Sequence, residues 1–290
     1  MLAGGFYYLP VYQAFLWIFL GTFLKVFLQI RQVMKQIAFI TGASSGIGLA
    51  LAQELAANGY ELALAARRQE QLSLLVSDVE RAGIRALALP CDVTDPVQVK
   101  HAVTSAKDHF GRIDLAILSA GISEATSATQ FIASRFERLL RTNLLGVAYC
   151  LEELLPLMQQ QGGGTIAAIS SLAGDRGIPG SAGYCATKAG LSTLFDGLRG
   201  ELRQQGIRLV TIEPGYVRTP MTESFGNMPF AMSAEDSARL ILERLVAGDR
   251  VIRFPLMPSL VMKLMRIMPV SLFDLITAKR RPVRLKAEES

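Results

Sequence analysis

A tyrosine and a lysine in one short run have the chemistry to move a proton. They are Tyr184 and Lys188, in the sequence Tyr-Cys-Ala-Thr-Lys, and a helix would place both on one face. A tyrosine hydroxyl ordinarily has a pKa of about 10, and a neighbouring ammonium favours the phenolate and lowers that value. Tyr184 is therefore predicted to be a general acid and base. The same spacing is common on ordinary helix surfaces, so further motifs must decide.

A glycine-rich run has the form of a phosphate-binding turn. Residues 41–48 read Thr-Gly-Ala-Ser-Ser-Gly-Ile-Gly, after the apolar run 37–40 and at the start of a helical pattern over 47–58. Glycine lets a backbone turn tightly and approach a ligand closely, and a helix N-terminus offers free N–H groups to an anion. The spacing Gly-x-x-x-Gly-x-Gly differs from the usual dinucleotide fingerprint. Taken alone, the run is also consistent with a simple turn.

Further polar and turn residues stand near the ends of predicted elements. Ser171 and the pair Pro214-Gly215 each follow an apolar run that is predicted to be a strand. Asn143 stands inside a helical pattern, which asparagine does not favour. Ligands bind at the carboxyl ends of the strands in an open parallel sheet. We therefore expect these residues to gather with Tyr184 and the glycine run at one sheet edge.

Strand and helix patterns alternate along most of the chain and are separated by turn residues. Strands are predicted over 36–40, 61–66, 85–89, 113–119, 165–170, 207–212 and 250–254. Helices are predicted over 47–58, 69–82, 96–110, 133–161, 182–205 and 234–247. Repeated strand–helix units indicate an α/β fold, a doubly wound Rossmann-type parallel sheet of about seven strands with helices on both faces. An apolar N-terminal helix is expected in addition.

In these motifs the chain resembles the short-chain dehydrogenase/reductase family, over about residues 35–254. The resemblance rests on residues 41–48, Cys91-Asp92-Val93, Ser119-Ala120-Gly121, Asn143, Ser171, Tyr184-x-x-x-Lys188 and Pro214-Gly215-x-Val217-x-Thr219. Ser171 precedes Tyr184 by thirteen residues, the usual interval in the family. One departure is Leu118-Ser119, where the family usually has two asparagines. The shorter hydroxyl of Ser119 is expected to loosen that strand end slightly.

The resemblance implies a role for each residue. Tyr184 would be the general acid when a ketone is reduced, and Lys188 would lower its pKa and bind the nicotinamide ribose. Ser171 would hydrogen-bond the substrate carbonyl, where negative charge develops. Asn143 would hold a water that links Lys188 to solvent. The cofactor would be bound by Gly42, Ser44, Ser45, Gly46, Ile47 and Gly48 at the ribose and pyrophosphate, by Asp92 and Val93 at the adenine, by Ala120, Gly121, Pro214 and Gly215, and by Val217 and Thr219 at the nicotinamide amide.

The end of the second predicted strand favours NADP(H) as the cofactor. Enzymes that use NAD place an Asp or Glu there to bind the ribose 2′-hydroxyl. This chain instead has Arg67 and Arg68, whose guanidinium groups suit a 2′-phosphate, and we expect Arg67 to make the main contact with Arg68 assisting. The alternative is two surface arginines that open a helix, although cations are disfavoured at a helix N-terminus.

The N-terminal segment has the composition of a membrane anchor. Residues 5–24 carry no charge, and about 20 apolar residues span a bilayer as a helix. Lys25, Arg31 and Lys35 follow and nothing positive precedes, which places the rest of the chain in the cytoplasm. The alternative is an enzyme that starts at Met34 and is cytoplasmic, with 1–33 an upstream extension.

Charge and cysteine usage exclude several classes of protein. The net charge of +5 comes from the two ends of the chain, so a nucleic-acid-binding domain is not indicated. Basic ends suit anionic lipid or are simply solvated tails. The three cysteines have no paired spacing, which argues against a disulfide framework and a zinc site. His101 and His109 are interpreted as helix-surface residues, and no metal is expected.

Three regions are expected. Residues 1–33 are the apolar segment, 34–254 the Rossmann-fold catalytic domain, and 255–290 an apolar and basic extension. This extension is predicted to lie on a membrane surface, to cap the substrate pocket, or to pack on the core or on a second subunit. A homodimer or homotetramer is expected.

The leading interpretation is an NADPH-dependent reductase of a lipophilic ketone or aldehyde, or the reverse alcohol oxidation. Apolar residues of the loop 216–232, among them Tyr216, Met221, Phe225 and Phe230, favour an apolar substrate. A membrane-attached NADP(H)-binding protein without a catalytic role is a second interpretation, which the full set of catalytic residues disfavours. A sugar epimerase or dehydratase is disfavoured by the compact length and the glycine spacing.

Overall fold

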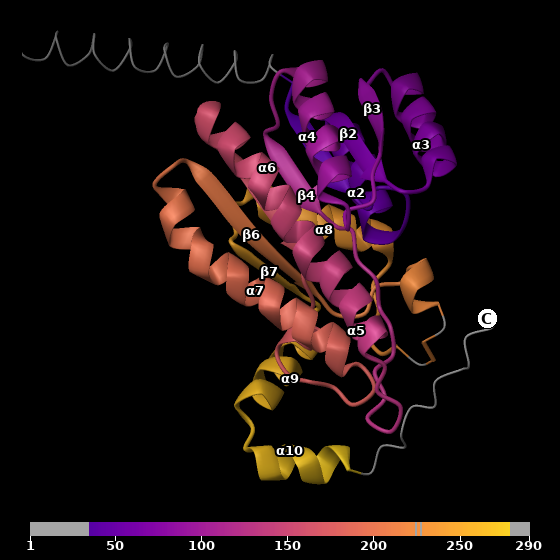
Figure 1. The fold of residues 1–290 in the computed structure, drawn as a ribbon, viewed down its shortest axis with the longest axis vertical. Helices are drawn as coiled ribbons and strands as arrows, with labels where there is room; N and C mark the ends of the chain where they lie inside the picture. Colours follow the sequence, from indigo (N-terminus) through magenta and orange to yellow (C-terminus); the bar gives the residue numbers. More distant parts are fainter. Residues whose placement is uncertain (1–34, 224, 227, 279–290) are drawn as a thin grey trace, which may run out of the picture. The chain divides into compact units, whose positions relative to one another are not determined.

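The computed structural model describes residues 35–223, 225–226 and 228–278 (Figure 1). The expected apolar helix over 5–24 and the basic tail over 279–290 lie outside these residues. Within the described part of the chain, no helix is both long enough and apolar enough to cross a bilayer.

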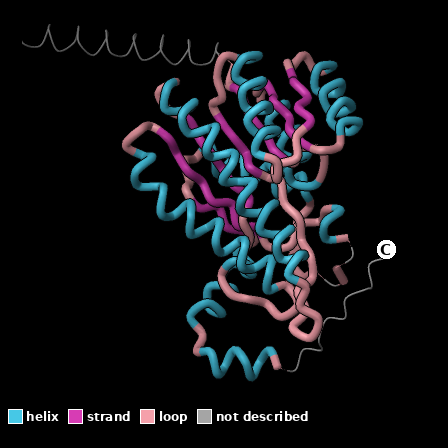
Figure 2. Tube along the Cα trace, viewed as in Figure 1, coloured by secondary structure: helices cyan, strands magenta, loops and turns pink. Residues whose placement is uncertain are grey.

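A parallel sheet forms the centre of the described residues, with the strand order β3-β2-β1-β4-β5-β6-β7 (Figures 1 and 2). The strands are β1 (Ile37–Thr41), β2 (Glu61–Ala66), β3 (Ala86–Pro90), β4 (Leu115–Leu118), β5 (Gly164–Ile169), β6 (Ile207–Pro214) and β7 (Val251–Phe254). Every pairing between them is parallel. This confirms the predicted seven strands and the doubly wound class.

The point where the chain reverses direction across the sheet lies between β1 and β4. The chain first builds β1, β2 and β3 outward, then returns to place β4 on the other side of β1. Thr41, the last residue of β1, is opposite Leu118, the last residue of β4. In an open α/β sheet a crevice forms at this reversal, beyond the carboxyl ends of the strands.

Helices cover both faces of the sheet and bury its apolar side chains. One core packs α2 (Gly46–Ala57), α3 (Gln69–Arg81) and α8 (Ala234–Val246) on one face. The other core packs α4 (Pro96–Phe110), α6 (Gly146–Gln160) and α7 (Ala182–Arg203) on the opposite face. In β1, Ile40 joins the first core and Phe39 the second. Strands buried on both faces explain the continuous apolar runs of the sequence.

The predicted single helix over 133–161 is wrong in one respect. It consists of α5 (Ala133–Leu140), a π-helical turn η1 (Arg141–Leu145) and α6. The wider turn carries Asn143, whose side chain is fully buried and hydrogen-bonded to two neighbouring segments. Single π turns inside helices are frequent at functional sites.

Two helices follow β7, where the sequence left the structure open. They are α9 (Leu256–Ile267) and α10 (Val270–Thr277), and they extend beyond the carboxyl edge of the sheet (Figure 1).

Candidate active site

A cavity of about 530 Å³ lies at the carboxyl edge of the sheet, where the chain reverses. Its walls include most of the predicted site: Gly42, Ser44, Ser45, Gly46, Ile47, Arg67, Arg68, Asp92, Val93, Ala120, Gly121, Ser171, Tyr184, Lys188, Pro214, Gly215, Val217 and Thr219. Gly48 and Asn143 stand behind this wall, where they hold lining segments in place. Residues from distant parts of the sequence therefore meet here as expected.

Lys188 is buried beneath the floor of the cavity. Its Nζ donates a hydrogen bond of 2.7 Å to the carbonyl oxygen of Ile169, the last residue of β5. Nζ also lies 5.6 Å from the centre of the Tyr184 ring, one turn earlier on α7. Burial disfavours the charged amine and lowers the pKa of Lys188 to about 8. Lys188 can therefore gain or lose its proton near neutral pH.

The prediction that Lys188 lowers the pKa of Tyr184 below 10 is wrong for this structure. Burial is the largest influence and raises the pKa of Tyr184 to about 12. A hydrogen bond with the Ser171 side chain acts in the opposite direction but is weaker. Desolvation prevails because burial disfavours the charged phenolate. Tyr184 is consequently a neutral phenol at physiological pH, the form that can donate a proton.

Ser171 is held at the end of β5 by the short 3-10 helix η2 (Leu172–Gly174). Its Oγ caps that helix by accepting a hydrogen bond of 3.1 Å from the Ala173 amide. The same hydroxyl donates to the Pro214 carbonyl oxygen at 3.4 Å. These contacts hold the Ser171 hydroxyl beside Tyr184, where both can reach one oxygen atom of a ligand.

Asn143 connects the loop after β4 to helix α7. Its Oδ1 accepts a hydrogen bond from the Ile122 amide at 2.8 Å, and its Nδ2 donates to the Ile122 carbonyl at 2.9 Å and to Thr187 Oγ1 at 3.2 Å. A Cβ atom at Gly121 would lie 3.3 Å from Asn143 Oδ1 and 3.6 Å from Lys188 Nζ. Asn143 thus positions the wall of the cavity next to Lys188.

The glycine run forms a backbone surface that can accept a close ligand. Gly42 has a φ of +68°, and a Cβ there would lie 2.8 Å from backbone atoms of Ala120. Gly46 has a φ of +56°, and a Cβ there would lie 3.2 Å from the Thr219 methyl group. The first turn of α2 contains no acidic residue, and the side chain of its N-cap Ser45 makes no capping bond. Its N–H groups therefore suit a phosphate.

The two arginines after β2 differ in their surroundings. Arg68 crosses to the glycine run, where its Nε and Nη2 donate to Ser44 Oγ at 3.2 and 3.0 Å. Arg67 is more open, with 70% of its side chain exposed and its Nη1 3.9 Å from an Asp92 carboxylate oxygen. Asp92 is itself fixed, since its Oδ1 accepts two hydrogen bonds of 2.9 Å from Thr94. Both guanidinium groups line the cavity.

The loop after β6 closes the opposite side of the cavity. Thr219 and Thr222 form a capping box at the 3-10 helix η3 (Pro220–Thr222), and Thr222 Oγ1 donates to the Val217 carbonyl at 2.7 Å. Thr41 performs a related task at the ends of β1 and β4: its Oγ1 accepts hydrogen bonds from the amides of Ser119 and Ala120 at 3.1 and 3.2 Å. The support from Thr41 offsets the missing asparagine side chain at position 119.

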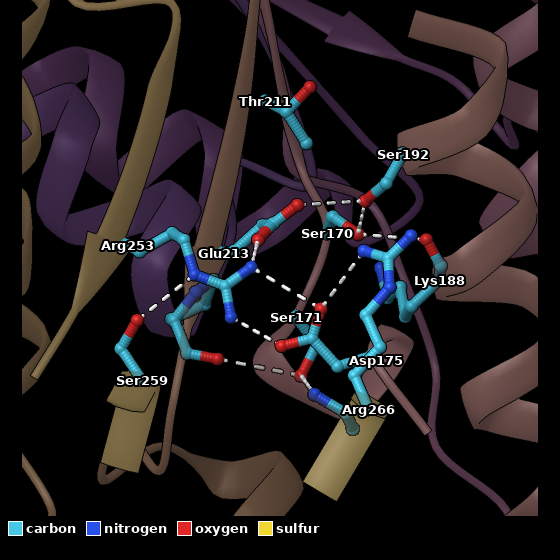
Figure 3. A network of polar contacts seen from close by, with 12 residues as sticks. Ser170, Ser171, Asp175, Lys188, Ser192, Thr211, Glu213, Arg253, Ser259 and Arg266 are labelled. Atoms are coloured by element: carbon cyan, nitrogen blue, oxygen red, sulfur yellow. Dashed lines mark hydrogen bonds and ion pairs between the residues drawn. The ribbon is translucent and has the colours of Figure 1, made fainter. Parts of the chain in front are cut away.

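Sequence reasoning missed a polar network behind Ser171 and Lys188 (Figure 3). Ser170 Oγ donates to the Lys188 carbonyl oxygen at 2.9 Å and contacts Ser192 Oγ, which donates to Glu213. The guanidinium of Arg253 joins Glu213 of β6 to Asp175, which lies just after η2. Burial raises the pKa of Glu213, and Arg253 opposes that rise. The signal in the sequence was an acidic residue inside the apolar strand 207–214.

The sequence matches the family described as short chain dehydrogenase over residues 36–229. An uncharacterized oxidoreductase of Myxococcus xanthus is 34% identical over 84% of this chain and 97% of its own length. A 3-oxoacyl-acyl-carrier-protein reductase of Staphylococcus aureus is 32% identical over 67% of this chain and 79% of its own length. Among solved structures, a levodione reductase is 30% identical with a TM-score of 0.72, covering 78% of this chain and 98% of that one.

A short-chain dehydrogenase/reductase from Burkholderia phymatum in complex with NAD has the same fold, with a TM-score of 0.74 at 23% identity over 87% of this chain and 98% of that one. Taken with the geometry of the cavity, these matches show that the chain belongs to the short-chain dehydrogenase/reductase family and is an oxidoreductase. The cofactor typical of this family is a nicotinamide dinucleotide.

The cavity fits such a cofactor on its own evidence. Three features that suit an anionic ligand lie along one wall. The backbone at Gly42 and Gly46 forms a cradle that a Cβ atom would crowd, the N-terminus of α2 has no acidic residue, and two guanidinium groups lie there. The Tyr184 side chain, a candidate proton donor, lines the same cavity. One elongated anionic ligand would contact all of them.

Proposed function

We propose that this chain is an NADPH-dependent oxidoreductase that interconverts a lipophilic ketone or aldehyde and the corresponding alcohol, with Tyr184 as the acid and base. The observation that carries the proposal is the convergence of Tyr184, Ser171 and Lys188 on the cavity that also holds the glycine run. When bound, a nicotinamide cofactor supplies or accepts a hydride.

Tyr184 and Ser171 would act together on the oxygen of the substrate. In the reduction, the carbonyl oxygen becomes an alcohol oxygen by gaining the proton of the Tyr184 hydroxyl. Ser171 Oγ would donate a hydrogen bond to the same oxygen as negative charge develops there. Lys188, whose pKa is about 8, stands next to Tyr184 and would favour the phenolate that this transfer leaves. Oxidation of the alcohol reverses these steps.

The preference for NADPH is supported by the two arginines at the end of β2. No acidic residue stands at positions 67 and 68 to receive a ribose 2′-hydroxyl. Arg68 is held against Ser44 at the glycine run, and Arg67 also lines the cavity. A guanidinium group binds phosphate oxygens with two parallel hydrogen bonds. We therefore exchange the roles expected from the sequence: Arg68 would make the closer contact with the phosphate, and Arg67 would assist.

A lipophilic substrate is supported by the apolar side chains of the loop after β6, which lines the cavity at Val217 and Met221. Tyr216, Met221, Phe225 and Phe230 belong to the loop after β6, and 41 to 65% of each is exposed. Tyr216 and Phe225 make an edge-to-face contact with ring centres 6.4 Å apart. Burying such groups against a ligand stabilises the complex by roughly 25 cal/mol per Å² of apolar area.

Residues 5–24 are proposed to anchor the chain in a membrane with the catalytic domain on the cytoplasmic side. The support is their length, their lack of charge and the basic residues Lys25, Arg31 and Lys35 that follow. An anchored enzyme could take its substrate from the bilayer.

The proposed reaction is tested by measuring NADPH oxidation with a series of ketones of increasing chain length, and by repeating the series with NADH. We expect kcat/KM to rise with chain length, and NADPH to be the better cofactor by at least about tenfold. Equal use of NADH would contradict the assignment of the arginines. A preference for short polar ketones would contradict the proposed substrate class.

A further inference from the structure

The side of α9 and α10 that faces away from the sheet is apolar and exposed. Along α9 the side chains of Leu256, Leu260, Leu264 and Ile267 follow one another at helical spacing, with exposed fractions of 71, 53, 62 and 78%. Leu275 and Ile276 of α10 are exposed by 67 and 53%. These six residues are called the outward apolar face below. Exposed apolar patches of this kind mark sites of interaction.

The inner side of the same helices is firmly attached to the catalytic domain. Arg176 Nη1 donates hydrogen bonds to the carbonyl oxygens of Met265 and Met268, at 3.3 and 2.9 Å. Its guanidinium carbon also lies 4.3 Å from the centre of the Phe273 ring on α10. Because the inner side is satisfied in this way, the outward apolar face does not need to pack on the core.

A second attachment fixes α9 through the network behind the active site (Figure 3). Arg253 Nε donates to the buried Ser259 hydroxyl of α9 at 3.0 Å, and Arg266 at the end of α9 lies 3.5 Å from Asp175. Asp175 and Arg176 are neighbours in the loop that begins with Ser171. The outward apolar face is therefore held in a fixed position relative to the catalytic loop.

The outward apolar face belongs to the same edge of the sheet as the mouth of the cavity. Helix α9 begins directly after β7, at the carboxyl end of that strand. The exposed apolar side chains of Phe225 and Phe230 follow β6 at the same edge. A flat apolar phase in contact with the outward apolar face would thus lie near the edge of the sheet that carries the cavity.

The charges beside the outward apolar face favour a lipid surface over a second copy of the chain as its binding partner. Lys263 and Arg266 are exposed beside the apolar residues of α9, and Asp274 is the one acidic residue of the described range 255–278. The sequence continues with the basic run Lys279-Arg280-Arg281. Two such faces would repel each other, whereas anionic lipid attracts basic residues that flank an apolar helix face.

We propose that the outward apolar face of α9 and α10 docks on the surface of an anionic lipid bilayer, with the helices lying in the interface. This contact goes beyond the proposed reaction and would be made in addition to any anchor formed by residues 5–24. It would present the mouth of the cavity to the bilayer, from which an apolar substrate could enter.

Docking is tested with a fluorophore that reports the polarity around it. The chain's three cysteines are buried, so a Leu264→Cys variant of the full chain can be labelled at the outward apolar face. The labelled chain is reconstituted with vesicles of phosphatidylcholine, with or without phosphatidylglycerol, that contain spin-labelled quencher lipids. A label on Ser73→Cys, exposed on α3, is the matched control.

We expect the emission at position 264 to move to shorter wavelength and to be quenched at least about twofold, more strongly with phosphatidylglycerol, because the label enters the interface. The label at position 73 should change little. Adding Lys263→Glu to the 264 probe should weaken the quenching, whereas Lys100→Glu, an exposed lysine of α4, should not. The signal does not depend on catalysis, so a failure of docking is separate from a failure of the proposed reaction.

Two results would overturn docking. The first is a label at position 264 that reports a polar environment while the chain sediments with the vesicles, which would assign the lipid contact to another segment. The second is a shift to shorter wavelength that increases with protein concentration and does not depend on lipid. This result would show that copies of the chain contact one another through the outward apolar face.

Discussion

Burial acts in opposite directions on the two titratable groups of the site. It raises the pKa of Tyr184 to about 12 and lowers that of Lys188 to about 8. Each shift favours the uncharged form, as expected when a group leaves water. The tyrosine is therefore protonated when a carbonyl substrate arrives, and the lysine is close to losing its charge.

The depressed pKa of Lys188 predicts how stability depends on pH. Above a pH of about 8 the folded chain releases this proton, whereas the unfolded chain keeps it up to the ordinary value of 10.5. The unfolded state then binds more protons, so this residue makes stability rise with pH between those values, by up to about 1.4 kcal/mol per pH unit. Urea unfolding of the wild type and of Lys188→Met, at pH 7 to 9, measures the difference.

We expect the wild type to gain stability relative to Lys188→Met as the pH rises from 8 to 9. The comparison cancels the contribution of the buried cysteines, because both proteins contain them. Their pKa values are raised, so they make stability fall as the pH rises. A constant difference across this range would contradict a depressed pKa for Lys188.

Arg68 carries the predicted choice between the two nicotinamide cofactors. Arg68→Ala removes the guanidinium group at Ser44 and should raise KM for NADPH by tenfold or more, because a hydrogen bond to a charged group contributes about 1.5–3 kcal/mol. KM for NADH should hardly change. Arg81→Ala, at the far end of α3 and paired with Asp78, is the matched control. If Arg68→Ala raised KM equally for NADPH and NADH, the proposed contact between Arg68 and the 2′-phosphate would be wrong.

The sequence could locate the candidate catalytic side chains but not the electrostatics that set their pKa values. The spacing of Tyr184 and Lys188 predicted one helix face, and both lie on α7. It could not predict that burial is the largest influence on the pKa of Tyr184, because desolvation depends on the atoms that surround a group in three dimensions. The sequence likewise favoured Arg67 over Arg68 as the main phosphate contact, but in the folded chain Arg68 is the residue that reaches Ser44, whereas Arg67 lies near Asp92.

At the scale of elements, the glycine run is needed where the loop after β1 and the loop after β4 approach each other closely. Gly42→Ala would place a Cβ 2.8 Å from the Ala120 backbone, at a positive φ. Gly83→Ala has a similar positive φ of +82° but open space around the added atom. Comparing the two variants separates the backbone strain, roughly 1–2 kcal/mol in each variant, from the effect of the steric clash in Gly42→Ala.

We expect Gly83→Ala to lower Tm by a few degrees and to leave NADPH binding unchanged. Gly42→Ala should lower Tm further and weaken NADPH binding at least about tenfold, since Ala120 must move away from the cavity wall. Thermal unfolding and fluorescence titration with NADPH measure the two effects. Unaltered NADPH binding in Gly42→Ala would show that this turn does not form part of the cofactor site.

The order and type of the elements followed from hydrophobic periodicity, and their bounds agree with the structure to within a few residues. The π-helical turn at Arg141–Leu145 was not predicted, because a single extra backbone residue does not change a helical hydrophobic pattern visibly. The asparagine inside that pattern was the available signal. The ion pairs of Arg253 with Glu213 and Asp175 join strands and loops far apart in sequence, which periodicity cannot foresee.

At the scale of the whole molecule, two separate parts of the chain are proposed to meet a membrane. Cells that express the full chain should retain it in the membrane fraction after a carbonate wash, because residues 5–24 would remain inserted. Deleting residues 1–33 should release at least part of it. A full chain found wholly in the soluble fraction would contradict the anchor. The expected homodimer or homotetramer stays a prediction.

The central claim is that Tyr184 transfers the proton in a carbonyl reduction. Tyr184→Phe keeps the ring and removes only the hydroxyl. We predict that kcat for ketone reduction falls by at least about 10²-fold, the scale of general acid catalysis, while the dissociation constant for NADPH is nearly unchanged. Tyr149→Phe, packed against the core on the α6 side of the sheet, should reduce ketones at the wild-type rate. A purified Tyr184→Phe enzyme with the wild-type kcat would contradict the account.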